Sequence, residues 1–494
     1  MSQRRRTAAC LLIVALAAVL AGWLIPRGPV TTPEAILALV GALGVGLASG
    51  WLAHTRWILL GAPVTFMVVF ELVRVRVDGP TVDGVALGDL YGVIALIGGR
   101  GVDALLMLLP LIVGCSWGVV LGRRRDRSAA ASGPVRRHPV RLVVLALSSA
   151  AVLLLVAGLL RPATTEAIVG ADGKTIAGSV AELVEVPIGG HDQAIMLRGV
   201  SVDAPVLLFL EGGPGGTAMG RIRNAGDALE KNFVVATWDQ RGTGKSYDAL
   251  EPTSTLTVDQ MVKDTIEVTD YLRDRFGQRK IYLVGSSWGT IIGTMAVQRS
   301  PELFHAYVGT GQMVDPFETD KLMYAESLAD AKARGDGGAV AALRALGEPP
   351  YDNTLNYPVA ISSNPKLMNF EHGADYSATS EYPASLFVRE YTLVQQLRGM
   401  AAIAETFNVL YPQLGDTDFR LDVPRLDVPV YLVEGRHEAA GRETLAREWF
   451  DLLVAPRKNW ILFEASGHTP PYDEPTRFAK VMSGIVAATP SGSS

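Results

Sequence analysis

The stretch "LVGSSWGTIIG", residues 283–293, decides how the second half of this chain folds. It continues the apolar run "KIYLVG" (280–285) and leads into the helix-like run "TIIGTMAVQ". Glycines stand two positions before and two positions after Ser287, and a G-x-S-x-G pattern between a strand and a helix predicts a sharp turn around a strained, exposed serine. Because only Ser287 occupies the centre of that turn, we predict that Ser287 and not Ser286 is a nucleophile.

Short apolar strands alternate with amphipathic helices on both sides of this turn. The strand candidates are 205–210, 232–238, 280–285, 305–310, 428–435 and 459–465. Such alternation predicts a mostly parallel sheet with helices on both faces. Residues 314–416 interrupt it with helical pieces and loops, so we expect a helical cap over the C-terminal edge of the sheet, where open α/β folds bind ligands. The core then occupies 163–313 and 417–488, and a disordered tail follows at 489–494.

A serine nucleophile needs a base, and the base needs a carboxylate that orients it. His468 is our candidate for the base, because the loop "FEASGHTPP" follows a strand and can reach the edge of the sheet. The acid should follow the preceding strand, where Glu438 lies one turn into the loop. Glu434, which continues that strand, and Asp427 are the alternatives. We therefore predict a triad of Ser287, Glu438 and His468, in the chain order typical of α/β hydrolases.

The glycine-rich loop "EGGPGG" (211–216) follows the strand candidate at 205–210. Acyl transfer needs hydrogen-bond donors for the developing oxyanion, and a glycine loop lets backbone amides approach a substrate closely. The amides of Gly213 and Trp288 are our candidates for this oxyanion hole. The alternative for the loop is a plain Gly/Pro turn without a ligand.

Three motifs together give residues 165–490 a specific resemblance. "GGPGG" (212–216), "WDQRGTGKS" (238–246) and "GSSWGT" (285–290) are similar, in order and spacing, to the GGPG, DQRG-x-G-x-S and G-x-SWG motifs of the proline iminopeptidase-like serine peptidases, a branch of the α/β-hydrolase superfamily. The resemblance implies a triad of Ser287, an acid and His468 under a helical cap. It also implies chemistry without a metal or an organic cofactor.

Two positions depart from the motifs of that branch. Glu211 stands where the histidine before GGPG is usual, and Glu438, in "GRHE", stands where the acid is usually aspartate. Glutamate can also orient a histidine, so the second change preserves the chemistry. The first change alters the polarity beside the oxyanion loop, which makes Glu211 a candidate substrate-binding residue.

The first 160 residues differ from the rest in composition. They hold 15 arginines, no lysine and 7 acidic residues, whereas residues 161–494 hold 30 basic and 43 acidic residues. We expect residues 1–162 to form a multi-pass membrane region within a lipid bilayer, because a spanning helix needs about 17–25 apolar residues. Five apolar runs have this length: 9–25, 35–53, 57–73, 104–121 and 142–160.

The arginines of this half predict its orientation. They cluster at the ends of the apolar runs without interleaved aromatic residues, which favours membrane topology over nucleic-acid binding. Short cytoplasmic loops carry the excess of positive charge, so we expect Arg4–Arg6 and the block 123–141 inside and everything after Arg161 outside. The first run could be a signal peptide, but without a small-residue cleavage site we expect an uncleaved helix. The short stretch Leu87–Ile97 is interpreted as interfacial or re-entrant.

These features predict a membrane-tethered serine hydrolase in the cell membrane, with its catalytic domain outside the cytoplasm. We expect an aminopeptidase of proline iminopeptidase type that acts on short peptides. The alternatives are a carboxylic-ester or lipid hydrolase, for which the membrane would supply substrate, and a non-catalytic ligand-binding or sensor protein.

Overall fold

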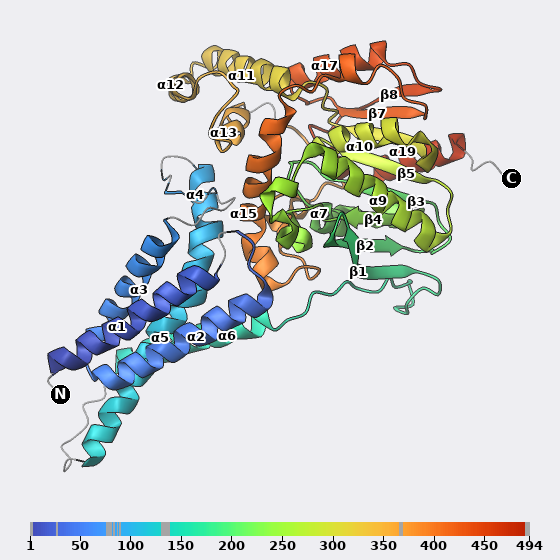
Figure 1. Cartoon of the computed structure of the whole chain (residues 1–494). Coiled ribbons are helices and arrows are strands. Elements are labelled where there is room, and N and C mark those ends of the chain that lie inside the picture. Colours follow the sequence, from blue (N-terminus) through green and yellow to red (C-terminus); the bar gives the residue numbers. More distant parts are fainter. Residues whose placement is uncertain are drawn as a thin grey trace. The chain divides into compact units, whose positions relative to one another are not determined.

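The computed structural model describes residues 3–25, 28–75, 82, 84–85, 87, 90–129, 139–364 and 369–489 (Figure 1). The chain divides into two compact units. The first comprises residues 1–86, 93–162 and 392–401, and the second comprises residues 87–92, 163–391 and 402–494. The main boundary therefore falls after Pro162, and a ten-residue piece of the expected cap belongs to the first unit.

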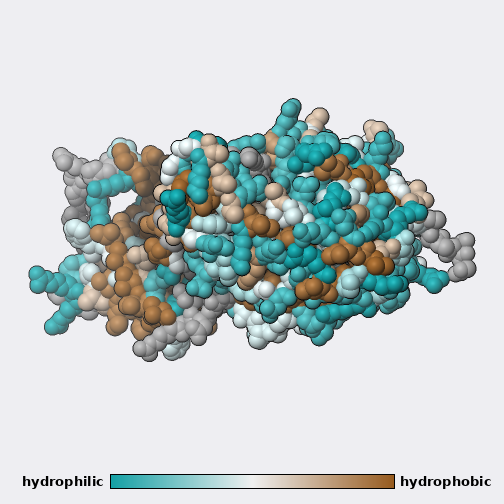
Figure 2. Space-filling view, turned by 90° about the horizontal axis from the view of Figure 1, so that it is seen from above, coloured by the Kyte–Doolittle hydropathy of each residue, from teal (hydrophilic) through white to brown (hydrophobic). Residues whose placement is uncertain are grey.

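The first unit consists of apolar helices. They are α1 (Gln3–Leu24), α2 (Thr32–Ala53), α3 (Ile58–Arg74), α4 (Leu90–Leu96), the π-helical turn η1 (Ile97–Gly101), α5 (Val102–Ala129) and α6 (Pro139–Leu159). Four helical stretches are long and apolar enough to cross a membrane: Gln3–Leu24, Thr32–Ala53, Leu90–Arg124 and Pro139–Leu159. These helices expose large apolar side chains, which are brown in Figure 2.

Two segments of this unit differ from what the sequence predicts. The apolar run at 57–73 forms α3, which has 17 residues and is shorter than the four candidate spans. The stretch Leu87–Ile97, interpreted as interfacial or re-entrant, does not stand apart. From Leu90 it is the beginning of a helical stretch of 35 residues that continues through η1 into α5. Asp89 lies outside the described residues.

Glycines and a buried ion cluster hold this unit together. A Cβ on Gly46 of α2 would lie 2.2 Å from the carbonyl oxygen of Leu111 on α5, so these helices pack backbone to backbone, as small residues allow in membranes. Asp103 binds two arginines: Arg74 Nη1 lies 2.8 Å from its Oδ2, and Arg398 Nη2 donates to its Oδ1. Residues 392–401, which include Arg398, belong to this unit.

An eight-stranded sheet forms the centre of the second unit, in the order β1-β2-β4-β3-β5-β6-β7-β8. The strands are β1 (Val180–Ile188), β2 (His191–Gly199), β3 (Val206–Leu210), β4 (Val234–Trp238), β5 (Ile281–Ser286), β6 (Phe304–Thr310), β7 (Val430–Gly435) and β8 (Lys458–Phe463). β1 and β2 pair antiparallel with each other, and β2 pairs antiparallel with β4. The remaining pairs are parallel, so the predicted fold class is confirmed.

Helices cover both faces of this sheet because strand residues alternate between two apolar clusters. Leu208 packs in one cluster with α9 (Val258–Phe276), α10 (Trp288–Arg299) and α17 (Ala440–Leu452). Its neighbours Leu207 and Phe209 pack in the other with α7 (Ala218–Ala225), α8 (Asp227–Glu230), α18 (Pro470–Asp473) and α19 (Pro475–Ala488). Thr257 caps the start of α9, because its hydroxyl accepts a hydrogen bond from the Gln260 amide.

Between β6 and β7 the chain forms the inserted helices that the sequence predicts. They are α11 (Pro316–Ala333), α12 (Gly337–Leu346), α13 (Asn356–Ser362), α15 (Leu393–Leu410) and α16 (Phe419–Asp422), with short 3₁₀ turns between them. Within the second unit, the later turns of α15 contact the glycine-rich loop, since a Cβ on Gly215 would lie 2.6 Å from the Ile403 carbonyl oxygen. The predicted tail at 489–494 lies outside the described residues from 490 onwards.

Candidate active site

Ser287 lies in the turn between β5 and α10, where the backbone is strained. Its φ of 52° and ψ of −119° lie in a region that residues with a side chain rarely adopt. Only glycine fits on either side: a Cβ on Gly285 would lie 2.6 Å from the Gly289 carbonyl oxygen, and a Cβ on Gly289 would lie 2.1 Å from the Leu210 carbonyl oxygen. The G-x-S-x-G pattern therefore follows from close backbone approach as well as from the turn.

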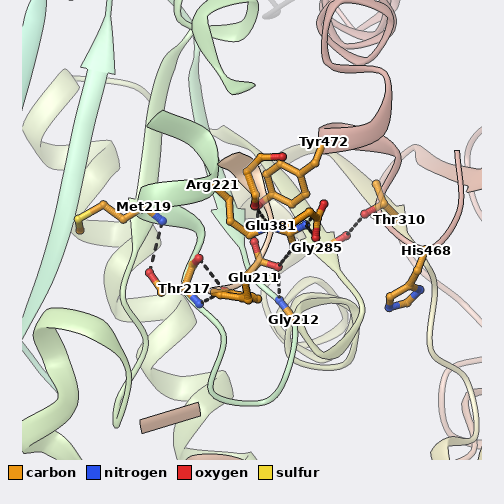
Figure 3. Close-up of polar contacts among 12 residues, drawn as sticks. Glu211, Gly212, Thr217, Met219, Arg221, Gly285, Thr310, Glu381, His468 and Tyr472 are labelled. Atoms are coloured by element: carbon orange, nitrogen blue, oxygen red, sulfur yellow. Dashed lines mark hydrogen bonds and ion pairs between the residues drawn. The ribbon is translucent and has the colours of Figure 1, made fainter. Parts of the chain in front are cut away.

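A hydrogen bond connects the turn that contains Ser287 to the end of β6, and His468 lies against the residue that follows β6. The Ser287 amide donates to the carbonyl oxygen of Thr310, 2.9 Å away. The next residue, Gly311, has no room for a side chain, because a Cβ there would lie 2.6 Å from Cε1 of His468. Figure 3 shows His468 beside Thr310. In this structure the Ser287 hydroxyl faces Met313 Sδ at 3.8 Å.

Glu438 pairs with His468, as the chain order predicts for an acid and a base. Its Oε2 lies 2.6 Å from Nδ1 of His468, and its Oε1 accepts a hydrogen bond from the Ala439 amide at 2.7 Å. The Glu438 side chain is 2% exposed and that of His468 is 35% exposed. Burial acts to raise the pKa of Glu438, but the charges of His468 and Arg442 and these hydrogen bonds outweigh it and lower the pKa to about 2.

The alternative acids lie elsewhere. Glu434 is fully buried in β7, where its Oε1 accepts a hydrogen bond from the Gln312 amide at 3.1 Å. Burial and the nearby charge of Glu438 raise the pKa of Glu434 to about 8. Asp427 is bound to the exposed Arg425, with 2.7 Å between Oδ1 and Nε. Among the three carboxylates considered, the structure places Glu438 against His468.

The glycine-rich loop passes directly beside Ser287. A Cβ on Gly212 would lie 2.9 Å from the Cβ of Ser287, and Gly213 has a φ of 120°, which favours glycine. Gln240, from the second motif, fixes the loop to the turn: its Nε2 donates to the Glu211 carbonyl oxygen at 3.0 Å, and its Oε1 accepts from the Trp288 indole at 2.9 Å. The two candidate oxyanion donors, Gly213 and Trp288, thus belong to segments that one side chain joins.

Glu211 lies in a closed, buried cluster beside this loop (Figure 3). Its Oε1 accepts hydrogen bonds from the Gly212 amide at 3.0 Å and from Arg221 Nη1 at 3.2 Å, and its Oε2 accepts one from the Tyr472 hydroxyl. The Arg221 guanidinium also stacks 3.7 Å above the Tyr472 ring and binds Glu381. Both oxygens of Glu211 are therefore bonded within the protein, and its substrate-binding role stays a prediction.

Arg442 also lies at the site, although the sequence argument did not consider it. Its Nη1 is 3.4 Å from Glu438 Oε1, 2.7 Å from His468 Nδ1 and 3.2 Å from His468 Nε2. Its Nη2 faces Met323 Sδ at 3.7 Å. The available signal was that Arg442 follows Glu438 by only four residues, in the first turn of α17 (Ala440–Leu452).

Within the described ranges, no group of three or more His, Cys, Asp or Glu side chains could hold a metal ion.

The chain is similar to several known proteins. A family model described as the alpha/beta hydrolase fold matches residues 205–337. The probable aminopeptidase YbaC of Bacillus subtilis (strain 168) is 31% identical over 309 residues, which are 62% of this chain and 96% of that protein. Among solved structures, proline iminopeptidase from Mycobacterium smegmatis is 20% identical to this chain and has a TM-score of 0.46. The match covers 62% of this chain and 98% of that chain. The proline iminopeptidase-related protein from Thermus thermophilus has 22% identity, 63% and 98% coverage, and a TM-score of 0.41.

Proposed function

The chain belongs to the α/β-hydrolase family, and from this premise we propose that it is a serine hydrolase that removes N-terminal residues from short peptides. The observation that carries the proposal is the 2.6 Å contact between His468 Nδ1 and Glu438 Oε2. His468 lies against Gly311, the residue after Thr310, whose carbonyl oxygen accepts a hydrogen bond from the Ser287 amide. The peptidase part is supported by the likeness to a protein named as a probable aminopeptidase.

The proposed reaction follows from the roles these residues can take. Ser287 Oγ attacks the carbonyl carbon of the scissile amide while His468 Nε2 accepts the hydroxyl proton. Glu438 holds the imidazole through Nδ1 and stabilises the imidazolium that forms. The oxyanion accepts hydrogen bonds from the amides of Gly213 and Trp288.

The two halves of the reaction share one proton carrier. His468 gives its proton to the leaving amine, the C–N bond breaks, and an aminoacyl ester remains on Ser287. A water molecule then attacks this ester while His468 takes its proton, and the return of that proton to Ser287 Oγ releases the amino acid. No further reactant is required.

Glu211 acts in this proposal as a positioning residue. It holds the Gly212 amide while Arg221 and Tyr472 hold its own carboxylate. The loop therefore keeps its shape beside Ser287 without committing a free carboxylate to the substrate.

Membrane attachment is the second part of the proposal. The four long apolar helices support a multi-pass anchor, and the distribution of arginine supports an outward-facing hydrolase unit. Protease added to intact cells should then degrade residues 163–494. Protection of that segment until the cells are lysed would place the hydrolase in the cytoplasm.

The activity can be tested on the full chain in detergent with aminoacyl arylamides, including the prolyl compound, and with acyl esters of similar size. We expect arylamide turnover, which Ser287→Ala abolishes. Ser286→Ala is a matched control, because the neighbouring Ser286 hydroxyl is buried and has no hydrogen-bond partner among the described residues. Turnover of esters without any turnover of arylamides or peptides would contradict the peptidase assignment and favour an ester or lipid hydrolase.

A further inference from the structure

We propose that Arg442 binds the α-carboxylate of the leaving residue, so that the preferred substrates are dipeptides with a free C-terminus. This inference rests on the proposed peptidase function and names its substrate class. Arg442 has two relevant features: it shares its one ionised carboxylate neighbour, Glu438, with His468, and it lies against the His468 ring. In a dipeptide, the leaving nitrogen and the carboxylate are also close together.

Two of the three nitrogens of Arg442, Nε and Nη2, have no strong hydrogen-bond acceptor in the described part of the chain. A guanidinium has five N–H donors, and a buried one normally has most of them bonded. The Arg442 side chain is 10% exposed, yet its Nε has no hydrogen-bond partner within the described part of the chain. Its Nη2 faces only a thioether sulfur, which is a weak acceptor. Its Nη1 is 3.4 Å from a Glu438 oxygen that already accepts the Ala439 amide at 2.7 Å.

The other carboxyl groups near Arg442 supply little negative charge. Asp320 and Glu434 both interact with it electrostatically. Burial raises the pKa of Asp320 to about 7 and that of Glu434 to about 8, so both bind protons near neutral pH. Glu438 is the ionised neighbour, and it is shared with His468. A second anion at this place would therefore be stabilised by the guanidinium.

Arg442 lies where a leaving group must pass. The two nitrogens of an imidazole ring point in divergent directions, and Nη1 of Arg442 lies within 3.2 Å of both in His468. In the proposed reaction Nε2 gives its proton to the leaving nitrogen, which must come within hydrogen-bond distance, about 2.6–3.2 Å. Because Nη1 approaches both ring nitrogens, it lies over the face of the imidazole, and its 3.2 Å distance from Nε2 puts it within about 6 Å of the leaving nitrogen.

The covalent geometry of a dipeptide brings its carboxylate to the same place. The leaving nitrogen is joined to the carboxylate carbon through one Cα, over bonds of about 1.46 and 1.52 Å. The carboxylate can therefore reach the Arg442 guanidinium while the nitrogen faces Nε2. A longer peptide or a C-terminal amide presents a neutral amide there. Because hydrogen bonds between ionised groups are about twice as strong as neutral ones, Arg442 distinguishes the two.

The test compares a free dipeptide, Ala-Ala, with its C-terminal amide, using the full chain in detergent and measuring amino acid release. We expect kcat/KM to be about 10- to 100-fold higher for the free dipeptide, as suits one charged hydrogen-bonded pair. Arg442→Gln should remove this preference, and Arg442→Lys, which keeps the charge but not the planar donors, should keep part of it. Arg436→Gln is a matched control on the same segment, because its side chain is 53% exposed and bound to Glu464, and it should retain the full preference.

Three other results would contradict the role proposed for Arg442. Equal turnover of dipeptide and amide by the unmodified chain would overturn the inference and leave the peptidase function intact. An Arg442→Gln variant that slows both substrates by the same factor would show that Arg442 only positions Glu438 and His468. Hydrolysis of neither peptide nor arylamide would overturn the proposed function itself, and the inference with it.

Discussion

Two buried pairs of glutamate and arginine lie near Ser287, and they differ in how completely they are bonded. In the first, Arg221 uses all three nitrogens: Nε binds the Ser380 carbonyl oxygen, Nη1 binds Glu211 and Nη2 binds Glu381. In the second pair, that of Glu438 and Arg442, the arginine has an Nε without a partner in the described part of the chain and a sulfur atom beside Nη2.

Under the proposed function, this difference distinguishes a structural cluster from a reactive one. A charge pair that is fully bonded and buried has nothing to offer a substrate, but breaking it leaves a charge without compensation. A pair with open donors beside a partly exposed histidine can bind and stabilise charge that develops during a reaction. We therefore expect substitutions in the Glu211 cluster to change stability and substitutions in the Glu438 cluster to change activity.

The largest expected effect comes from Glu438→Gln. The amide keeps the shape of the side chain but cannot stabilise the imidazolium or fix its tautomer, a change that lowers kcat about 10⁴-fold in other serine triads. We expect a fall of about this size in arylamide turnover, together with a lower thermal unfolding midpoint, because the buried Arg442 loses its partner. The matched variant Glu211→Gln should lower the midpoint while retaining most of the turnover. If both variants lost kcat equally and kept their unfolding midpoints, the comparison would be wrong.

The next effect concerns stability. Arg221→Met removes the partner of a buried carboxylate, and breaking such a pair costs about 3–5 kcal/mol. The unfolding midpoint of the variant should fall, measured by thermal denaturation in the same detergent. Exposed Arg425→Met is the control, because its pair with Asp427 is open to solvent and should contribute at most about 1 kcal/mol. A midpoint for Arg221→Met as high as that of the control would contradict the structural role.

The smallest expected effect is a dependence of the protein's stability on pH, caused by the Glu434 carboxyl group. Its pKa is raised from 4.5 to about 8 by burial and by Glu438, so the folded state holds its proton more tightly than the unfolded state does. The stability from this group is complete below about pH 4.5 and is lost as the pH rises through about 8. Glu434→Gln, which imitates the neutral form, should flatten the decline of the unfolding midpoint across this range.

Glu464→Gln serves as the control for that experiment. Glu464 is exposed, and its bond to Arg436 lowers its pKa, so it has no protonated form to lose in this range. The control should follow the unmodified chain from pH 4.5 to 8. A Glu434→Gln variant with the same pH dependence as the control would show that Glu434 is ionised in the folded protein.

The parts of the site that sequence could predict are those fixed by short-range geometry. Gly285 and Gly289 are required because a Cβ would meet backbone atoms of the same turn or of β3, and this leaves Ser287 at the centre. Glu438 and His468 follow parallel strands, so they necessarily meet at one edge of the sheet. The six strands from β3 to β8 were predicted from their apolar runs, and all but the half-buried edge strand β8 are largely buried.

Other features depend on contacts between residues that are far apart in the sequence, and such contacts produce no local sequence pattern. Tyr472 and Glu211 are 261 positions apart, and Arg398 and Asp103 are 295 apart, so neither pair leaves a spacing in the sequence. β1 was missed because it lies at the edge of the sheet and is largely half-buried, without a continuous apolar run. Residues 392–401 have the pattern of a cap helix, and long-range contacts such as the bond between Arg398 and Asp103 assign them to the first unit.

The central claim is that Ser287 is the nucleophile of a working serine hydrolase. The most direct measurement is labelling of the full chain with a fluorophosphonate probe, followed by mass spectrometry of the labelled peptide. We predict a single adduct on Ser287, present in Ser286→Ala and absent in Ser287→Ala and after denaturation. No labelling of the folded chain, or an adduct on another residue, would contradict the account.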